Sequence, residues 1–197
     1  DLSIVSATKY YSGHSDVMGG SLAVSKRVFK KVMMAQNMTG LRLSPDDAYF
    51  IMRGIRTLDV RLDKHEHNAI KIAKFLSKKK NIKVLYPYKK NTKNYKLWRK
   101  YYSGSSGLMG LKITAKNKKN IDKFVNSLTL FGHGYSWGGY ESLALHQEIK
   151  EQGKRKYLNL NKNEYIVRLH VGLEDINDLL KDISNSLKYL KWAIINL

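Results

Sequence analysis

The chain has 197 residues, 43% of them hydrophobic, which is enough for one large domain or two small ones with packed cores. It has no cysteine, which excludes disulfides, thiolate nucleophiles and cysteine-ligated metals, and no apolar run reaches the roughly 18 residues of a membrane span. The 36 Lys and Arg residues outnumber the 16 Asp and Glu residues, giving a formal net charge of +20 that raises nucleic-acid binding as a hypothesis.

The first informative stretch is Ser6-Ala-Thr-Lys-Tyr-Tyr-Ser-Gly-His-Ser-Asp16. Residues Asp1–Val5 before it are typical of a strand, and the glycines that follow permit tight turns. A lysine at the end of a strand, beside the hydroxyls of Ser6 and Thr8, offers an amine to a cofactor aldehyde and donors to its phosphate. The alternative from the residues alone is that Lys9 is a solvated charge, as most lysines are.

A strand and two helical segments follow. Ser21–Val24 is predicted as a strand, and Lys26–Met38 as a helix whose apolar residues fill a core: Val28, Phe29, Val32 and Met33. Ser44 is predicted as the N-cap of the next helix, with Pro45 in the first helical position. From residue 48 the pattern continues as a long helix, and its inward face is predicted to comprise Leu62, Ala69, Ile72, Ala73 and Leu76.

The middle of the chain predicts alternating strands and helices. His65 and His67, two apart on a helix, point in different directions and lack acidic or cysteine neighbours, so no metal site is predicted. Trp98–Tyr102, within a lysine- and tyrosine-rich part-helical segment at 88–102, is the candidate nucleic-acid patch. The Gly/Ser-rich residues 103–110 lack the ending of a P-loop and are interpreted as structural. The remaining elements here are strands at 81–86 and 111–114 and a helix at 120–128 with Ile121, Phe124, Val125 and Leu128 inward.

The second informative stretch is Leu130-Phe-Gly-His-Gly-Tyr-Ser-Trp-Gly-Gly-Tyr-Glu-Ser-Leu143. Glycines interleaved with aromatic residues disfavour a helix or a plain core strand, and favour a loop in which the backbone approaches a ligand over a purely structural bend. Tyr165–Val171 then alternates as a strand that carries Arg168. A buried arginine needs an anionic partner, which is either a carboxylate of the protein or the carboxylate of a substrate. From Asp175 a final helix places Ile176, Leu179, Leu180, Ile183, Leu187 and Leu190 on one face.

The two stretches resemble the Cys/Met-metabolism family of pyridoxal-phosphate-dependent enzymes, and the resemblance extends along nearly the whole chain. It implies an α/β chain with the aspartate-aminotransferase-like fold of PLP-dependent transferases. Residues 1–57 would be the end of the large cofactor domain and residues 58–197 the small C-terminal domain. Because only about half of a family protein is matched, we expect the C-terminal portion of a longer protein that is inactive alone.

The resemblance also implies roles for individual residues. Lys9 would form the Schiff base with pyridoxal 5′-phosphate and act as the catalytic base, while Ser6 and Thr8 would help to hold the phosphate. Ser136 and Trp137 would line the substrate pocket. Arg168, before Gly172-Leu-Glu-Asp175, would bind the substrate's α-carboxylate. No metal site is implied.

The amino-acid sequence of this loop resembles the β-lyase branch of the family. Trp137 precedes the glycines, and His146-Gln-Glu-Ile-Lys150 replaces the segment that γ-lyases and γ-synthases carry. The implied reaction converts L-cystathionine to homocysteine, pyruvate and ammonia in methionine biosynthesis, in a cytoplasmic homotetramer built as a dimer of dimers. Two alternatives stay open: a split or decayed remnant that acts as a scaffold or partner-binding piece, and a basic nucleic-acid-binding protein.

Overall fold

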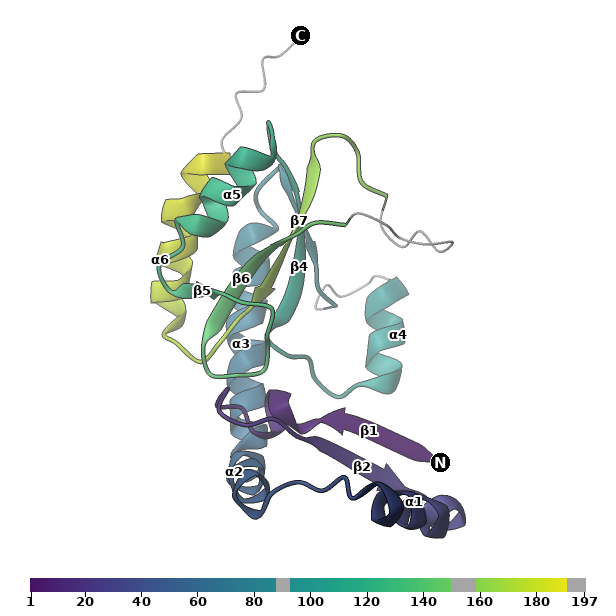
Figure 1. Cartoon of the computed structure of the whole chain (residues 1–197). Coiled ribbons are helices and arrows are strands. Elements are labelled where there is room, and N and C mark those ends of the chain that lie inside the picture. The colour runs from purple at the N-terminus through teal and green to yellow at the C-terminus, as the bar shows by residue number, and fades with distance from the viewer. Residues whose placement is uncertain (88–92, 150–158, 191–197) are drawn as a thin grey trace. The chain divides into compact units, whose positions relative to one another are not determined.

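The computed structural model describes residues 1–87, 93–149 and 159–190. The chain divides into two compact units (Figure 1). The first contains residues 1–60 together with 138–140, and the second contains residues 61–137 and the chain from 141 onward. The predicted division at residue 57 into cofactor and C-terminal domains remains a prediction about the whole protein.

The first unit is built around a two-stranded antiparallel sheet. β1 (Leu2–Ser6) pairs with β2 (Gly20–Val24), and a single π-helical turn, η1 (Ala7–Tyr11), follows β1 directly. Two helices complete the unit: α1 (Lys26–Thr39) and α2 (Pro45–Ile55). The predicted N-cap is confirmed, because the Ser44 hydroxyl accepts a hydrogen bond of 3.0 Å from the Asp47 N–H.

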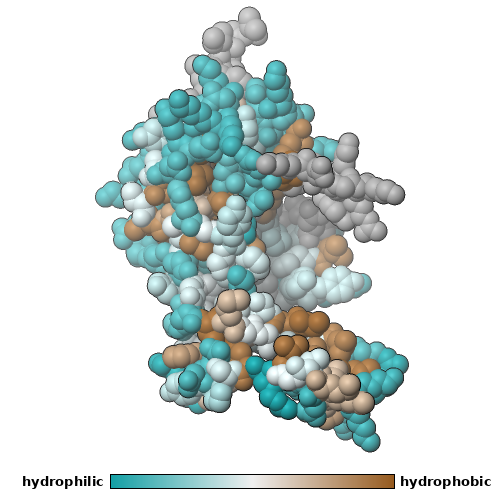
Figure 2. Space-filling view, viewed as in Figure 1, coloured by the Kyte–Doolittle hydropathy of each residue, from teal (hydrophilic) through white to brown (hydrophobic). Residues whose placement is uncertain are grey.

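The core of the first unit is small. Ala7, Val17 and Ile51 are buried, with Tyr11 packed against them. The prediction that α1 fills a core is wrong: none of its residues is buried, and the Phe29 side chain is 51% exposed. Its apolar face instead lines an open groove of about 530 Å³ against β2. Figure 2 shows apolar side chains at the surface of this unit, where most of the exposed large apolar residues of the described chain lie.

The second unit is a five-stranded sheet in the order β3-β4-β7-β6-β5. Neighbouring strands run antiparallel, except that β5 and β6 run parallel. The strands are β3 (Ile82–Leu85), β4 (Leu108–Thr114), β5 (Phe131–His133), β6 (Ser142–Gln147) and β7 (Glu164–His170). The helices are α3 (Leu58–Leu76), α4 (Lys93–Tyr101), α5 (Lys118–Asn126), α6 (Ile176–Ser186) and the 3₁₀ turn η2 (Leu187–Leu190).

One face of this sheet forms the core, as the alternation of β4 indicates. Met109, Leu111 and Ile113 are buried, whereas the residues between them are only half-buried. The helices α3, α5 and α6 are drawn with the sheet in Figure 1. They contribute the opposing side chains of the same apolar cluster, among them Ile72, Leu76, Ile121, Phe124, Leu179 and Ile183. The predicted inward residues of the helix at 120–128 are all buried, so that prediction is confirmed.

The long helix expected from residue 48 onward is interrupted. α2 ends at Ile55 and α3 begins at Leu58, because the Thr57 N–H and hydroxyl both donate to the carbonyl of Gly54. Leu62, predicted to face inward, is only half-buried. Within residues 1–87, 93–149 and 159–190, no helix combines the length and apolarity that crossing a membrane requires.

Candidate active site

The lysine-bearing turn in the first unit begins where β1 ends. Lys9 has non-helical backbone angles (φ −92°, ψ −122°) inside η1, and its carbonyl accepts a hydrogen bond of 2.9 Å from the Gly13 N–H. The Ser12 N–H donates to the carbonyl of Ala7, also at 2.9 Å, and Ala7 is buried. Positive φ angles at Gly13 and Ser15 then reverse the chain. The half-buried lysine therefore stands on a turn that is closed by its own backbone.

The two hydroxyls beside Lys9 have different surroundings. The Thr8 hydroxyl accepts from the Gly19 N–H at 2.9 Å and donates to the Gly19 carbonyl at 3.3 Å, so it ties the lysine turn to the start of β2. Ser6 is exposed at the end of β1, and its hydroxyl makes no hydrogen bond within the described part of the chain. Ser6 can therefore donate to a ligand directly, whereas Thr8 would first have to turn its proton away from Gly19.

Two glycines allow other backbone segments to approach this turn. A Cβ at Gly54 in α2 would lie 2.2 Å from the Ser12 carbonyl oxygen and 2.3 Å from that of Tyr11. Gly138 has φ +86°, and a Cβ there would lie 2.8 Å from the Tyr10 nitrogen. Because real Cβ atoms do not approach so closely, only glycine fits at either position. Both contacts fall within the first unit, to which residues 138–140 belong.

Arg168 lies in β7, the central strand of the second unit, opposite Gly110 of β4 and Leu145 of β6. Its Nη2 donates to the carbonyls of Gly134 at 3.0 Å and Ser136 at 3.3 Å. Its guanidinium carbon lies 5.7 Å from the centre of the Trp137 ring. The second unit therefore brings together Arg168, Ser136 and Trp137, the three residues that the family resemblance assigns to the substrate.

The guanidinium retains donors for a ligand. Its Nε and Nη1 groups make no hydrogen bond to the described residues, and no described Asp or Glu pairs with Arg168. A structural salt bridge, the alternative left open from the sequence, is thus not formed with any described residue. The half-buried Arg168 can therefore donate single hydrogen bonds from Nε and Nη1 to a carboxylate. Two parallel bonds would require Nη2 to release one of its two carbonyl partners.

A buried polar network follows Arg168 along the chain, and the sequence analysis missed it. The Glu174 carboxylate accepts from the Ser142 N–H at 2.6 Å and from its hydroxyl at 2.8 Å, and the Ser142 hydroxyl accepts from the Gly172 N–H at 2.8 Å. From α3, Asn68 donates to the carbonyls of Gly172 and Glu174 at 3.1 and 3.0 Å. The only signal in the sequence is a set of polar residues on the inward face of α3, where apolar ones were expected.

His65 belongs to the same region of α3. It is fully buried, its Nδ1 lies 2.7 Å from the Val171 carbonyl, and its ring centre is 5.1 Å from that of His170. Burial lowers the pKa of His65, and the positive charge of Arg61 adds to this effect, while the Val171 carbonyl opposes it. His67 is exposed, and the described residues contain no group of three or more potential metal ligands.

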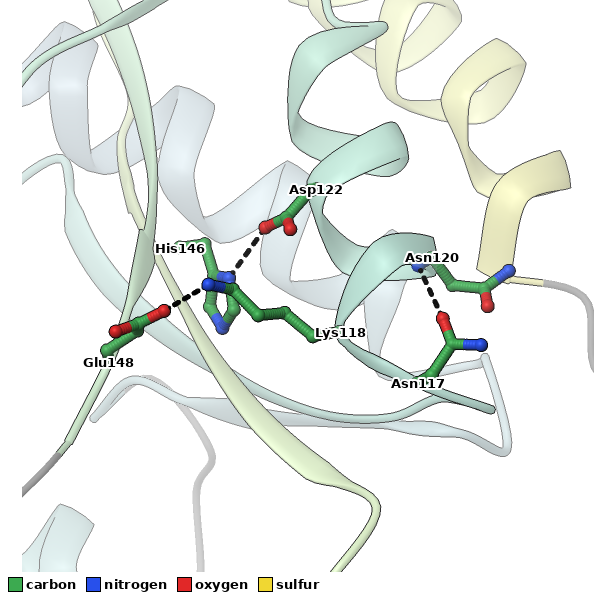
Figure 3. A network of polar contacts seen from close by, with 6 residues as sticks. All are labelled: Asn117, Lys118, Asn120, Asp122, His146 and Glu148. Atoms are coloured by element: carbon green, nitrogen blue, oxygen red, sulfur yellow. Dashed lines mark hydrogen bonds and ion pairs between the residues drawn. The ribbon is translucent and has the colours of Figure 1, made fainter.

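A second polar cluster joins α5 to β6 at the surface of the second unit (Figure 3). His146 Nδ1 lies 2.8 Å from the Asp122 carboxylate, and Lys118 pairs with Glu148 beside it. These residues line a pocket of about 460 Å³. Their charged groups are satisfied by one another, so the cluster is explained as a link between helix and strand. Of the segment 146–150 singled out in the sequence, residue 150 lies outside the described residues.

The candidate nucleic-acid patch lies on α4 and just beyond it. The Arg99 guanidinium is 5.7 Å from the Trp98 ring centre, and Arg99 also donates to the Ser103 carbonyl. Lys100 lies 5.3 Å from the ring centre of Tyr101. The cations thus rest on their own neighbouring rings, as is common on solvated helix faces. Residues 88–92 of this segment lie outside the described residues.

Comparison with known proteins decides the family. The model of the family described as "Cys/Met metabolism PLP-dependent enzyme" matches residues 1–188. The chain belongs to this family. It is 36% identical over 188 residues to a putative cystathionine β-lyase of Rhizobium johnstonii and 35% identical over 191 residues to the cystathionine β-lyase MetC of Escherichia coli. Each alignment covers 93% of this chain but 47% of the relative, so the chain spans about half the length of these curated relatives.

Solved structures confirm the predicted fold. A cystathionine γ-synthase of Xanthomonas oryzae pv. oryzae, solved with cystathionine, matches with a TM-score of 0.84 and 30% identity over 96% of this chain and 50% of that one. The α/β fold of PLP-dependent family members is therefore present, and pyridoxal 5′-phosphate is confirmed as the family's cofactor. Other relatives at 32–36% identity are named as γ-lyases or as a racemase. Family membership thus identifies the cofactor, but it leaves open which of several reactions is catalysed.

Proposed function

We propose that this chain is the C-terminal part of a carbon–sulfur β-lyase that cleaves L-cystathionine, and that it works together with the upstream half of a family protein. The overall reaction takes up water and gives homocysteine, pyruvate and ammonia. The observation that carries the proposal is that Arg168, next to Trp137, keeps its Nε and Nη1 donors available for a ligand. The β-lyase names of the two relatives above and the tryptophan ahead of the loop glycines support the β-lyase branch.

The donors of the lysine turn fit pyridoxal 5′-phosphate. Ser6 offers an exposed hydroxyl, Thr8 offers a second one once it turns from Gly19, and both can donate to phosphate oxygens. Lys9 supplies the amine that holds the cofactor's aldehyde carbon. When bound, the cofactor supplies an electron-poor ring that accepts the electron pair of the broken Cα–H bond.

Lys9 carries out the proton transfers in this proposal. Its amine would take the proton from the substrate Cα. When the bond between Cβ and sulfur breaks, the sulfur would leave with the bonding electrons, and protonated Lys9 would give it the proton taken from Cα. Backbone hydrogen bonds from Ser12 and Gly13 close the turn beneath Lys9 and limit the positions that its amine can reach.

Arg168 binds and orients the substrate. Its two bonds to the carbonyls of Gly134 and Ser136 fix the guanidinium plane, and its Nε–H or Nη1–H can then donate a hydrogen bond to the α-carboxylate. Ser136 and Trp137 line the same side of the pocket. Loss of a charged hydrogen bond of this kind costs about 1.5–3 kcal/mol, and more if the carboxylate is left buried without a partner. By family resemblance, the complete enzyme would be a cytoplasmic homotetramer acting on a small amino-acid substrate.

The test uses a hybrid in which this chain replaces the corresponding half of the Escherichia coli relative. Purified hybrid is supplied with pyridoxal phosphate and L-cystathionine, and the keto acid products are separated. Cleavage at Cβ gives pyruvate, whereas cleavage on the other side of the sulfur gives 2-oxobutyrate, so the product identifies the branch. Pyruvate that disappears in the Lys9→Ala hybrid supports the proposal. A folded, cofactor-loaded hybrid that releases 2-oxobutyrate, or no keto acid, would reject the β-lyase assignment.

A further inference from the structure

The loop that carries Ser136 and Trp137 is unusually short for the two strands that it connects. It joins β5 to β6, which are adjacent and parallel, although only residues 134–141 separate them. Parallel neighbours are ordinarily joined by a crossover of about a dozen residues or more, usually through a helix. This loop has no helix of its own to hold it, and its residues 138–140 belong to the other compact unit. Contacts at its two ends hold it within the second unit, and Gly138 lies against the lysine turn within the first.

Both ends of the loop are bonded to the same segment of chain. At the start, the carbonyls of Gly134 and Ser136 accept from Arg168. At the end, the N–H and hydroxyl of Ser142 both donate to the carboxylate of Glu174. Arg168 and Glu174 are six residues apart, on β7 and the turn that follows it. Any movement of Glu174 therefore acts on the loop and on the strand of Arg168 together.

The Glu174 end is itself anchored. Ser142 is fully buried, and its hydroxyl also accepts from the Gly172 N–H at 2.8 Å, which closes a ring of hydrogen bonds between β6 and the turn after β7. Asn68 of α3 is fully buried as well and donates to the carbonyls of Gly172 and Glu174. A carboxylate that receives two donors at 2.6 and 2.8 Å inside such a network holds its partners in one geometry.

We infer that Glu174 is a positioning residue, which sets the substrate-side loop against Arg168 by clamping Ser142. The inference rests on the proposed function, because only that proposal assigns substrate binding to the loop and to Arg168. The clamp itself is a statement about loop position. It can be tested in the chain alone, without cofactor or turnover.

Trp137 reports the position of the loop. The chain has three tryptophans, and changing Trp98 and Trp192 to Phe leaves Trp137 as the only one, beside the Arg168 guanidinium. In this background, Glu174→Gln keeps the size of the side chain and removes its charge. We expect Trp137 emission to change, and its acrylamide quenching constant to rise about two-fold, as for a loop that has opened locally. Glu174→Asp keeps the charge on a shorter side chain, so its emission and quenching constant should lie between those of the Glu174 background and those of Glu174→Gln.

A matched control is available in the same unit. Glu66 accepts from the N–H and the hydroxyl of Ser105, both at 3.0 Å, and so makes the same kind of clamp on a different loop. Glu66→Gln should lower the melting temperature but leave Trp137 emission and quenching unchanged. If Glu174→Gln does not fold, Ser142→Ala removes only the hydroxyl bonds and should shift the same readouts less far. Unchanged Trp137 readouts in folded Glu174→Gln or Ser142→Ala, or an equal change in Glu66→Gln, would overturn the inference.

The clamp and the proposed function can be refuted independently of each other. Trp137 readouts that do not respond refute the clamp, whatever the hybrid enzyme does. A clamp that responds in the isolated chain stands even if the hybrid releases no pyruvate, and then only the assignment of the loop to the substrate is lost.

Discussion

Replacing Gly54 by alanine tests how the lysine turn is held, because helix propensity and packing predict opposite signs. In a helix interior, Gly→Ala ordinarily stabilises by about 0.5–1 kcal/mol, since alanine loses less backbone entropy. Here the new Cβ would lie 2.2 Å from the Ser12 carbonyl oxygen and 2.3 Å from that of Tyr11. Both obstacles are backbone, so α2 and the turn must separate by about 1 Å, and overpacking of this kind costs about 1–3 kcal/mol. We take the upper end and expect a net destabilisation of about 2 kcal/mol.

The measurement must resolve the first unit from the second. Hydrogen exchange followed by mass spectrometry of peptides from residues 1–60 gives the local free energy of opening for η1 and α2. Gly40→Ala is the control for packing, because a Cβ there would meet nothing within 4 Å, although Gly40, unlike Gly54, has a positive φ of +65°. It should cost about 1–2 kcal/mol for the backbone angle and leave exchange in the lysine turn unchanged. Stronger protection of α2 in Gly54→Ala than in the wild type would refute the packing argument.

The remaining predictions concern the loop, the pH dependence and the core. Gly138→Ala should increase hydrogen exchange at Lys9 and Tyr10 more than Gly40→Ala does, because its Cβ would lie 2.8 Å from the Tyr10 nitrogen; equal effects would contradict this. Burial lowers the pKa of His65 in the folded state, so as the pH falls the unfolded chain binds a proton at His65 before the folded chain does. The stability that neutral His65 contributes is therefore complete above about pH 6.5 and is lost as the pH falls through the lower, folded-state pKa. His65→Gln should therefore show a smaller fall in melting temperature between about pH 7.5 and about pH 5.5 than the wild type. Phe124→Ala should cost the second unit about 3–5 kcal/mol in urea unfolding, since Phe124 is fully buried, and a loss below about 1 kcal/mol would mean that α5 is not packed on the sheet.

Periodicity predicted the parts of the fold in which one face is apolar. Alternation identified β7, and three- and four-residue spacing identified α5 and α6, because most of their inward residues are hydrophobic. The same rule failed for α1, whose apolar face lines an open groove in this chain. Periodicity shows that a face is apolar and does not show what covers it.

The polar interior was invisible to this kind of reasoning. His65 and Asn68 lie on the buried face of α3, and only the structure shows the carbonyls of Val171, Gly172 and Glu174 that receive them. The sequence grouped Ser136, Trp137 and Arg168 through resemblance, and the geometry shows how: Arg168 holds the loop by its carbonyls. Partners more than about 100 residues apart in the chain leave no local pattern, so such contacts require the fold.

The central claim is that Lys9 is the lysine that carries the cofactor, and one measurement addresses it directly. The hybrid enzyme is incubated with pyridoxal phosphate, reduced with borohydride, digested, and mapped for the lysine that has gained the reduced adduct. The account predicts a single adduct on the peptide that contains Lys9, although lysine is abundant in the chain. A folded hybrid whose adduct is carried by other lysines, with Lys9 unmodified, would contradict the account.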